Sequence, residues 1–254
     1  IGSYLSSHWQ RYDLAGDVDG DGRSDILAFH YRDPLYFGLP EGYAFGITYS
    51  LPHQGSPGYN IAGRFGDYTE GFGHHATVIA DLNQDGKRDL AVGAPGRVDI
   101  ACCVPGRVDI LLSTGFGQPI FRSLYGVDDG TSASHGSLGT WLDGSRDLDG
   151  DGITDLLVSA PGANAQRGYV DAYKLPDFTL LWRVRPEGPM DQHARRPVFV
   201  GDLDGDGASE WAVVDPWASY GGPLSGRVWI YKGAQGGEAT SFCPASVNST
   251  GQPA

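Results

Sequence analysis

The chain is poor in the residues that several classes of protein require. Its 254 residues include three cysteines, one methionine and 18 lysines and arginines, against 31 aspartates and glutamates. The formal net charge of −13 argues against nucleic acid as a partner, because nucleic-acid binding needs a basic face. No stretch of 18 apolar residues occurs, so we predict no membrane span. No secretory signal is present at the start, so we expect a mature, trimmed or partial chain.

Motifs of catalysis are also absent. The sequence has no Gly-x-Ser-x-Gly elbow, no His-Glu-x-x-His, no phosphate-binding loop and no Cys-x-x-Cys. The adjacent His74 and His75 are expected at the head of a strand, with side chains on opposite faces, which favours a structural role. Asp128 and Asp129 precede Gly130 in a turn. We therefore predict no enzyme activity.

The few cysteines leave their pairing open. Cys102 and Cys103 are adjacent, and Cys243 stands alone. Cys243 can pair with either of them or with a residue outside this chain, and an odd count leaves one thiol over. Asn248 begins an Asn-Ser-Thr triplet, which is a candidate glycosylation acceptor.

Glycine, by contrast, is abundant. The 39 glycines are roughly twice the usual share, and 16 prolines accompany them. Short apolar runs lie between these turn-forming residues, a pattern typical of many short strands. The composition therefore predicts an all-β protein, which at this length is often one domain.

An acidic loop of one design occurs four times, with glycine always at its sixth position. Side chains at positions 1, 3, 5 and 9, with the main-chain carbonyl at position 7, can supply a hard cation with oxygen ligands. Glycine permits the sharp turn because it has no Cβ. The predicted ligands are Asp17, Asp19, Asp21, Arg23, Asp25, Asp81, Asn83, Asp85, Lys87, Asp89, Asp147, Asp149, Asp151, Ile153, Asp155, Asp202, Asp204, Asp206, Ala208 and Glu210.

The predicted cation is calcium, with up to four ions in the chain. Magnesium retains its waters and rarely takes an all-protein cage, and zinc prefers histidine and cysteine, which the loops lack. Four calcium ions add eight positive charges and change the formal charge from −13 to about −5. Because weak calcium sites fill outside cells, we predict an extracellular or cell-surface location.

The loops are distinct from the EF-hand, which shares the first half of their pattern. An EF-hand needs glutamate at position 12 and a helix on each side. Position 12 is alanine or valine in all four loops. The loops are followed by short apolar runs that read as buried strands, at 26–29, 90–92, 156–158 and 211–214.

The similarity extends beyond the loops. Phe72-Gly73 lies nine residues before the second loop, and Gly93-Ala94-Pro95 follows its strand. Leu138-Gly139 and Ser159-Ala160-Pro161 have the same places around the third loop. Further strands with period-2 alternation are expected at 106–112, 168–173, 226–231, 119–125 and 179–184.

These motifs resemble the FG-GAP repeat of the integrin α-chain β-propeller, over roughly residues 5 to 235. The resemblance implies a β-propeller of repeats with about four strands each and a calcium loop in each blade. The first repeat lacks both FG and GAP, and the fourth has His193-Ala194 and Glu210. The middle two cation sites therefore match the family best.

The resemblance also implies a domain plan. One propeller spans 1–240, with repeats at about 1–65, 66–128, 129–190 and 191–240, and 241–254 forms a tail or linker. Integrin-type propellers resemble seven-bladed rings, whereas four repeats are visible here. A closed four-blade ring, an arc completed by another copy and a piece of a longer polypeptide all stay open. An open arc would leave an unpaired edge strand that favours self-association.

Two aromatic residues are candidates for a ligand surface. Trp217 and Tyr220 lie in the loop 216–223, where they can stack on a sugar or seat a protein. We predict a secreted calcium-binding module for adhesion or ligand recognition, with structural calcium and a protein or glycan bound at the propeller face. The alternatives are a self-assembling structural or surface-layer subunit and a carbohydrate-binding lectin.

Overall fold

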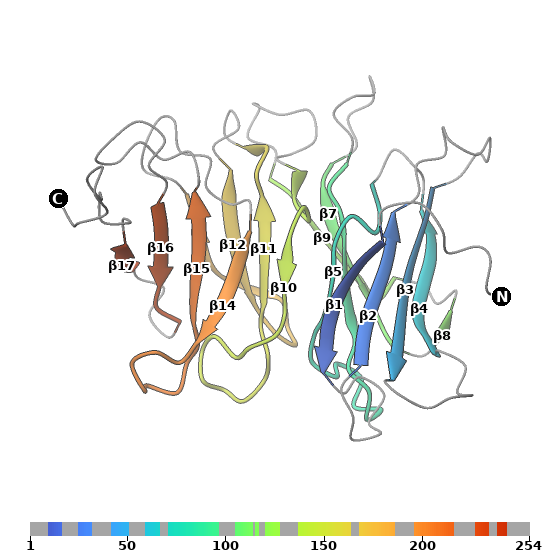
Figure 1. Ribbon diagram of the computed structural model, residues 1–254, viewed down its shortest axis with the longest axis horizontal. Helices are drawn as coiled ribbons and strands as arrows, with labels where there is room; N and C mark the ends of the chain where they lie inside the picture. Colours follow the sequence, from blue (N-terminus) through green and yellow to red (C-terminus); the bar gives the residue numbers. More distant parts are fainter. Residues whose placement is uncertain are drawn as a thin grey trace, which may run out of the picture.

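The computed structural model places the chain in a row of β-sheets (Figure 1). It describes residues 10–16, 25–31, 42–50, 59–66, 71–96, 105–113, 115–116, 120–127, 137–163, 168–185, 196–215, 227–233 and 238–242. Side chains are described within these ranges from residue 71 to 233, except at 115–116, 215 and 227. In this described part, no helix has the length and apolar character needed to cross a membrane.

The described strands form four sheets. The strands are β1 (Gln10–Gly16), β2 (Asp25–Tyr31), β3 (Gly42–Ser50), β4 (Tyr59–Gly66), β5 (Ala76–Val78), β6 (Leu90–Ala94), β7 (Arg107–Leu111), β8 (Gly115–Phe116), β9 (Arg122–Tyr125), β10 (Leu142–Asp143), β11 (Leu156–Ala160), β12 (Tyr169–Lys174), β13 (Thr179–Val184), β14 (Pro197–Gly201), β15 (Glu210–Asp215), β16 (Arg227–Tyr231) and β17 (Glu238–Phe242). Sheet 1 has the order β1-β2-β3-β4-β8, sheet 2 β5-β6-β7-β9, sheet 3 β10-β11-β12-β13 and sheet 4 β14-β15-β16-β17.

The all-β prediction is confirmed, and the apolar runs after the loops are strands. These runs form β2, β6, β11 and β15, each of which is the second strand of its sheet. All residues of β6 and β11 are buried. A strand that is buried on both faces reads as a continuous apolar run, which is why the sequence revealed these strands.

Two strands depart from the predicted repeat plan. β8 belongs in sequence to the second repeat, yet it pairs in parallel with β4 of sheet 1, where it covers the edge of that sheet. β17 extends beyond residue 240, into the segment predicted as a tail, because Ser241 and Phe242 pair with Trp229 and Val228.

The first strands of the sheets lie next to one another in chain order. β1 contacts β5, β5 contacts β10, and β10 contacts β14. Sheets 1 and 4 lie at opposite ends of the row (Figure 1). Each sheet therefore packs on its sequence neighbour, as expected for repeats that cannot bury their apolar faces alone.

The hydrophobic core lies between the sheets. One cluster joins Ile79 and Val108 of the second repeat to Leu142 and Val158 of sheet 3. A second cluster joins Leu148, Leu157 and Val170 to Trp211, Val213 and Trp229 of sheet 4. Each fully buried large apolar side chain contributes about 1.5–3 kcal/mol to folding. Buried apolar contacts between neighbouring sheets therefore stabilise the described part.

A close approach of two backbones fixes the spacing of sheets 2 and 3. A Cβ on Gly93 would lie 1.9 Å from the carbonyl oxygen of Gly139. Gly139, whose φ is +94°, donates its backbone N–H to Ser159 at 3.0 Å. The glycines of the FG and GAP motifs therefore allow contact between repeats, in addition to any role in turns.

We expect Gly93→Ala to lower the free energy of unfolding by more than about 3 kcal/mol, because the backbones of the two sheets must separate to admit the methyl group. Gly201→Ala is the control, since a Cβ there meets nothing within 4 Å and only the φ of +90° opposes it. That strain costs about 1–2 kcal/mol. Urea unfolding measures both variants, and equal losses would contradict the close approach.

Candidate metal centres

The described acidic loops share one place in their sheets. Each joins the first strand to the second: residues 81–89 lie between β5 and β6, 147–155 between β10 and β11, and 202–210 between β14 and β15. The last two loops lie at the lower end of sheets 3 and 4 in Figure 1. The repeat therefore places equivalent oxygen-rich loops at one end of neighbouring sheets.

The first carboxylate of each loop holds the turn. Asp147 Oδ1 accepts backbone N–H groups from Asp149 at 3.1 Å and Gly150 at 2.7 Å, and its Oδ2 accepts that of Gly152 at 2.6 Å. Asp81 and Asp202 accept the equivalent glycine N–H, at 2.8 and 3.0 Å. The glycine at position 6 has a φ of +87°, +87° and +92° in the three loops, as its predicted role requires.

The carboxylates at positions 3 and 5 are held by their own backbone. At position 5, the Oδ1 of Asp85, Asp151 and Asp206 accepts the N–H two residues on, at 2.8–2.9 Å. At position 3, Asp149 and Asp204 accept through Oδ1 in the same way, at 3.3 Å. Each of these side chains therefore keeps a second oxygen that no backbone group occupies.

The carboxylate at position 9 is buried beneath the loop. Asp89 and Asp155 are 0 % exposed. Asp155 accepts the N–H of Leu148 in its loop at 2.8 Å and that of Leu175 after β12 at 3.0 Å. Asp89 accepts from the equivalent residues Leu82 and Ser113, each at 2.8 Å. Position 9 therefore ties the loop to the third strand of its sheet.

Burial opposes the charge of these carboxylates. Burial raises the pKa of Asp155 to about 6, although its two backbone hydrogen bonds act in the opposite direction and stabilise the charged form. Burial raises the pKa of Asp89 as well. A cation bound beside them would favour their charged form.

Glu210 differs from the two aspartates at position 9. Its Oε2 accepts the N–H of Leu203 at 2.6 Å, but its buried Oε1 has no hydrogen-bond partner. Glu210 is only 3 % exposed. A buried carboxylate oxygen without a partner costs free energy, which a bound cation would offset. This unpartnered oxygen therefore favours a cation at the fourth loop, and it does so independently of the number of acidic residues there.

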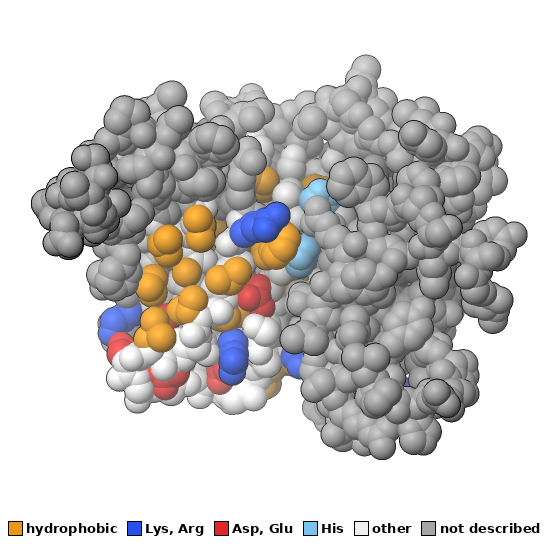
Figure 2. Space-filling view, viewed as in Figure 1, with side chains coloured by type: hydrophobic (Ala, Val, Ile, Leu, Met, Phe, Trp, Pro, Cys, Tyr) orange, Lys and Arg blue, Asp and Glu red, His pale blue; other side chains and the backbone are white. Residues whose placement is uncertain are grey.

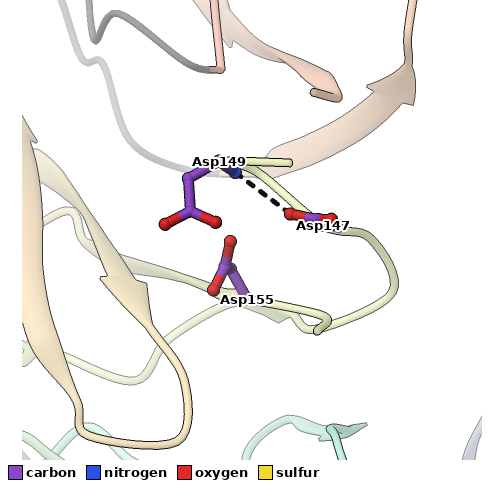
Figure 3. A group of neighbouring side chains, drawn as sticks. All are labelled: Asp147, Asp149 and Asp155. Carbon is purple, nitrogen blue, oxygen red and sulfur yellow. Dashed lines mark hydrogen bonds between the residues drawn. The ribbon is translucent and has the colours of Figure 1, made fainter. Parts of the chain in front are cut away.

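Two of the loops bring three carboxylates together. One oxygen from each of Asp147, Asp149 and Asp155 lies within 4.8 Å of the other two (Figure 3). In Figure 3 the carboxylates of Asp149 and Asp155 face each other, while Asp147 lies beside them in the turn. In the fourth loop the group consists of Asp202, Asp204 and Asp206, with position 5 in place of position 9. The main-chain carbonyl at position 7 stays a predicted ligand.

The second loop differs from these two in its ligand residues, and most of the first loop is not described. In the second loop, position 3 is Asn83, which donates from Nδ2 to Asp85 Oδ2 at 3.1 Å. The first loop, from Asp17 to Arg23, lies outside the described residues, and of its predicted ligands only the backbone of Asp25 is described, at the start of β2. The ligand role of this loop stays a prediction.

Two lysines were missed by the sequence analysis. Lys174 Nζ forms an ion pair with Asp149 and lies 2.7 Å from Asp151 Oδ2. Lys232 Nζ lies 2.5 Å from Asp204 Oδ2. The lysines hold the pKa values of Asp151 and Asp204 below the usual range. The signal in the sequence is a Tyr-Lys pair at the end of the third strand in both repeats.

A buried ion pair lies away from the loops. Asp171 on β12 is 0 % exposed, and both its oxygens lie 2.6 Å from the guanidinium of Arg183 on β13. Tyr173 also donates to it, at 3.1 Å. Burial raises the pKa of Asp171 despite these partners. Two fully used oxygens indicate a structural role in holding the two strands together.

The expected position of the two histidines within a strand was wrong. His74 and His75 precede β5 instead of beginning it, and both contact the segment 140–142 at sheet 3. His74 Nδ1 lies 3.1 Å from the carbonyl oxygen of Thr140, and the His75 ring lies 4.0 Å from that of Trp141. Because a turn rather than a strand carries them, strand alternation does not apply. Both residues serve the contact between repeats.

Several predicted features lie outside the described residues. These are the ligand-surface candidates Trp217 and Tyr220, the turn residues Asp128 and Asp129, the cysteines Cys102, Cys103 and Cys243, and the glycosylation candidate Asn248.

Comparisons with known proteins agree with the repeat motifs. The family described as FG-GAP repeat matches residues 72–117 and 138–173. Integrin alpha-7 of Homo sapiens is 32 % identical over 178 residues, covering 69 % of this chain and 13 % of that protein. Phosphatidylinositol-glycan-specific phospholipase D of Rattus norvegicus is 30 % identical over 175 residues, covering 63 % and 20 %. Integrin alpha-E of Mus musculus is 24 % identical over 214 residues, covering 80 % and 17 %.

The chain thus carries FG-GAP repeats and is distantly similar to integrin alpha chains and to this phospholipase D. It spans a fifth or less of the length of the three relatives. The matched repeats are the second and third of the four predicted from the loops.

We expect Asp155→Ala to lower the free energy of unfolding by about 2–4 kcal/mol even in chelator, because the N–H groups of Leu148 and Leu175 lose their acceptor. The matched control is Asp206→Ala in the fourth loop, where the exposed aspartate accepts from Ala208. That change should cost less than about 1 kcal/mol. Equal losses in urea unfolding would rule out the proposed tie to the third strand.

Proposed function

Because the chain carries FG-GAP repeats with acidic loops at one end of its sheets, we propose that it is a calcium-binding recognition module that acts outside the cell. The observation that carries the proposal is the pair of three-carboxylate groups at equivalent places in sheets 3 and 4. Calcium has a structural role, and a protein or glycan partner binds at the face formed by the connecting loops.

Calcium fits the loops better than other cations do. The predicted shell is made of carboxylate and carbonyl oxygens, and calcium takes six to eight such ligands in flexible geometry. The unpartnered Glu210 Oε1 and the raised pKa of Asp155 both show charge that the protein itself compensates only in part. The bound ion would neutralise this charge and restrict the motion of the loop.

The arrangement of the sheets supports a propeller. Each described repeat forms a sheet of at least four strands, and the first strands adjoin in chain order. A propeller places repeated four-stranded sheets around an axis in this way. The chain would supply four such sheets of the ring.

Recognition is favoured over catalysis by how the described polar groups are used. The loop carboxylates are fixed by backbone hydrogen bonds, and Asp171 is held by Arg183 and Tyr173. Such groups suit a rigid support for a binding surface. Weak calcium sites fill where calcium is abundant, which supports the extracellular location.

Calcium should raise the melting temperature relative to chelator. Each filled site adds about 2.7 kcal/mol when calcium exceeds its dissociation constant a hundredfold. Asp202→Asn should reduce the shift, whereas Arg185→Gln, which changes an exposed charged residue outside the loops, should leave it unchanged. Calorimetry of the full chain measures the shift, and identical melting curves in calcium and chelator would end the calcium proposal.

A glycan and matrix-protein array tests recognition directly. The expected result is binding of one ligand class in calcium and its loss in chelator. Glycan hits would favour the lectin alternative, and protein hits would favour adhesion. An array that is blank in both conditions would contradict recognition and favour self-assembly.

A second candidate function is assembly with further copies of the chain. It is favoured by the exposed apolar face of sheet 4, the last sheet of the row. Leu203 is 61 % exposed, whereas the equivalent Leu148 is 0 % exposed because it packs against sheet 4. Val214 is 43 % exposed, whereas the equivalent Ser159 is fully buried. Figure 2 shows hydrophobic side chains gathered in the region of β14 and β15. We propose that a second copy covers this face.

The lysine variant Leu203→Lys should therefore weaken self-association at least tenfold, since it places a charge on the covered face. Phe121→Lys is the control, because Phe121 is 53 % exposed on sheet 2, away from this face. Light scattering across a concentration series measures both variants. A wild-type chain that stays monomeric at all concentrations would exclude assembly.

A further inference from the structure

Lys174 and Lys232 occupy equivalent places beside the acidic loops. Each lies at the end of the third strand of its sheet, and the equivalent residue of sheet 2 is Leu112. The equivalence follows from the strand registers, in which Tyr173 and Tyr231 pair with the residue just after their loops. A lysine is therefore present in two of the three described repeats.

The lysines contact the carboxylate oxygens that accept no hydrogen bond from the backbone. Asp149 and Asp151 accept backbone N–H groups through Oδ1, and Lys174 contacts the Oδ2 of both. Lys232 contacts Oδ2 of Asp204, whose Oδ1 accepts from Asp206. These Oδ2 atoms are the free oxygens at positions 3 and 5, so the ammonium groups take the place where a cation would be expected.

The second loop lacks both the lysine and one carboxylate. Its position 3 is Asn83, whose amide donates to Asp85 Oδ2, the oxygen equivalent to the one that Lys174 contacts on Asp151. Its three ligand carboxylates are accompanied by Lys87 and Arg88 within the loop, so residues 81–89 carry a formal charge of −1. The third and fourth loops have four carboxylates and no basic residue, and one lysine from the third strand changes their formal charge from −4 to −3. The third-strand lysine is thus present at the two loops that have no basic residue of their own.

We propose that Lys174 and Lys232 are internal counter-cations, which hold the metal-free loops in shape and which a divalent cation must displace. The inference rests on the proposed calcium binding. It means that the third and fourth loops bind calcium more weakly than four carboxylates alone would, and that calcium binding releases an ammonium group from each loop. The lysine that contacts two carboxylates, Lys174, has the larger effect.

The test is Lys174→Met in the full chain. Hydrogen exchange of the loop 147–155 is followed during a calcium titration, which assigns binding to that loop. The calcium concentration that gives half of the full protection should fall about tenfold or more, because no ammonium competes for the carboxylates. In chelator, the variant should melt at a lower temperature than wild type, because the like charges of the loop lose their partner.

Two further variants make the test specific. Lys87→Met removes an equal charge from position 7 of the second loop, where the exposed Lys87 pairs with no described carboxylate, and should leave the loop 147–155 unchanged. Leu112→Lys introduces the lysine into sheet 2 and should weaken calcium binding at the loop 81–89 about tenfold.

The outcomes separate this inference from calcium binding itself. If wild type and Lys174→Met bind calcium with the same affinity, the proposed role of the lysine is wrong, whereas the proposal of calcium sites is supported. Binding that appears only when the lysines are replaced supports the lysine role. If neither wild type nor the variants bind calcium at any loop, both proposals fail.

Discussion

Each described loop ends in a carboxylate buried at the start of the second strand of its sheet, and the local structure depends on how that charge is compensated. Asp89 and Asp155 accept one N–H from the loop and one from the segment after the third strand, so a single side chain joins three parts of the repeat. Burial of this charge is costly, as the raised pKa of Asp155 shows. A cation beside it would lower the cost, and metal binding would then add to the stability of the sheet.

The repeats serve as comparisons for one another. Glu210 reaches the same place with a longer side chain and leaves Oε1 without a partner, where both oxygens of Asp155 are used. Leu148 is covered by the following sheet, whereas Leu203 is exposed. Position 3 and the end of the third strand change together, because the lysine is present at the two loops that carry four carboxylates and absent at the loop with Asn83. These differences underlie the proposals that calcium binding differs between loops and that a second copy covers the last sheet.

Much of this could be predicted from the sequence, because the signals are local. Each signal is close in sequence to the loop or strand that it predicts. These signals are the loop glycines, the spacing of the carboxylates and the apolar runs of β6 and β11. The contacts between repeats could not be predicted in this way. The ring of His75 packs against that of Trp141, the backbone of Gly93 lies against that of Gly139, and β8 pairs with β4 of another repeat. Lys174 reaches a loop 25 residues away in sequence, which only the strand register brings close.

The most direct test of the account is a count of the calcium ions bound per chain, by equilibrium dialysis of the 254-residue chain at millimolar calcium, followed by elemental analysis. The loops predict more than one ion per chain and up to four, with one ion lost when Asp202 is replaced by asparagine. A count of zero would contradict the account, because the buried Asp89 and Asp155 and the unpartnered Oε1 of Glu210 would then have no divalent cation beside them.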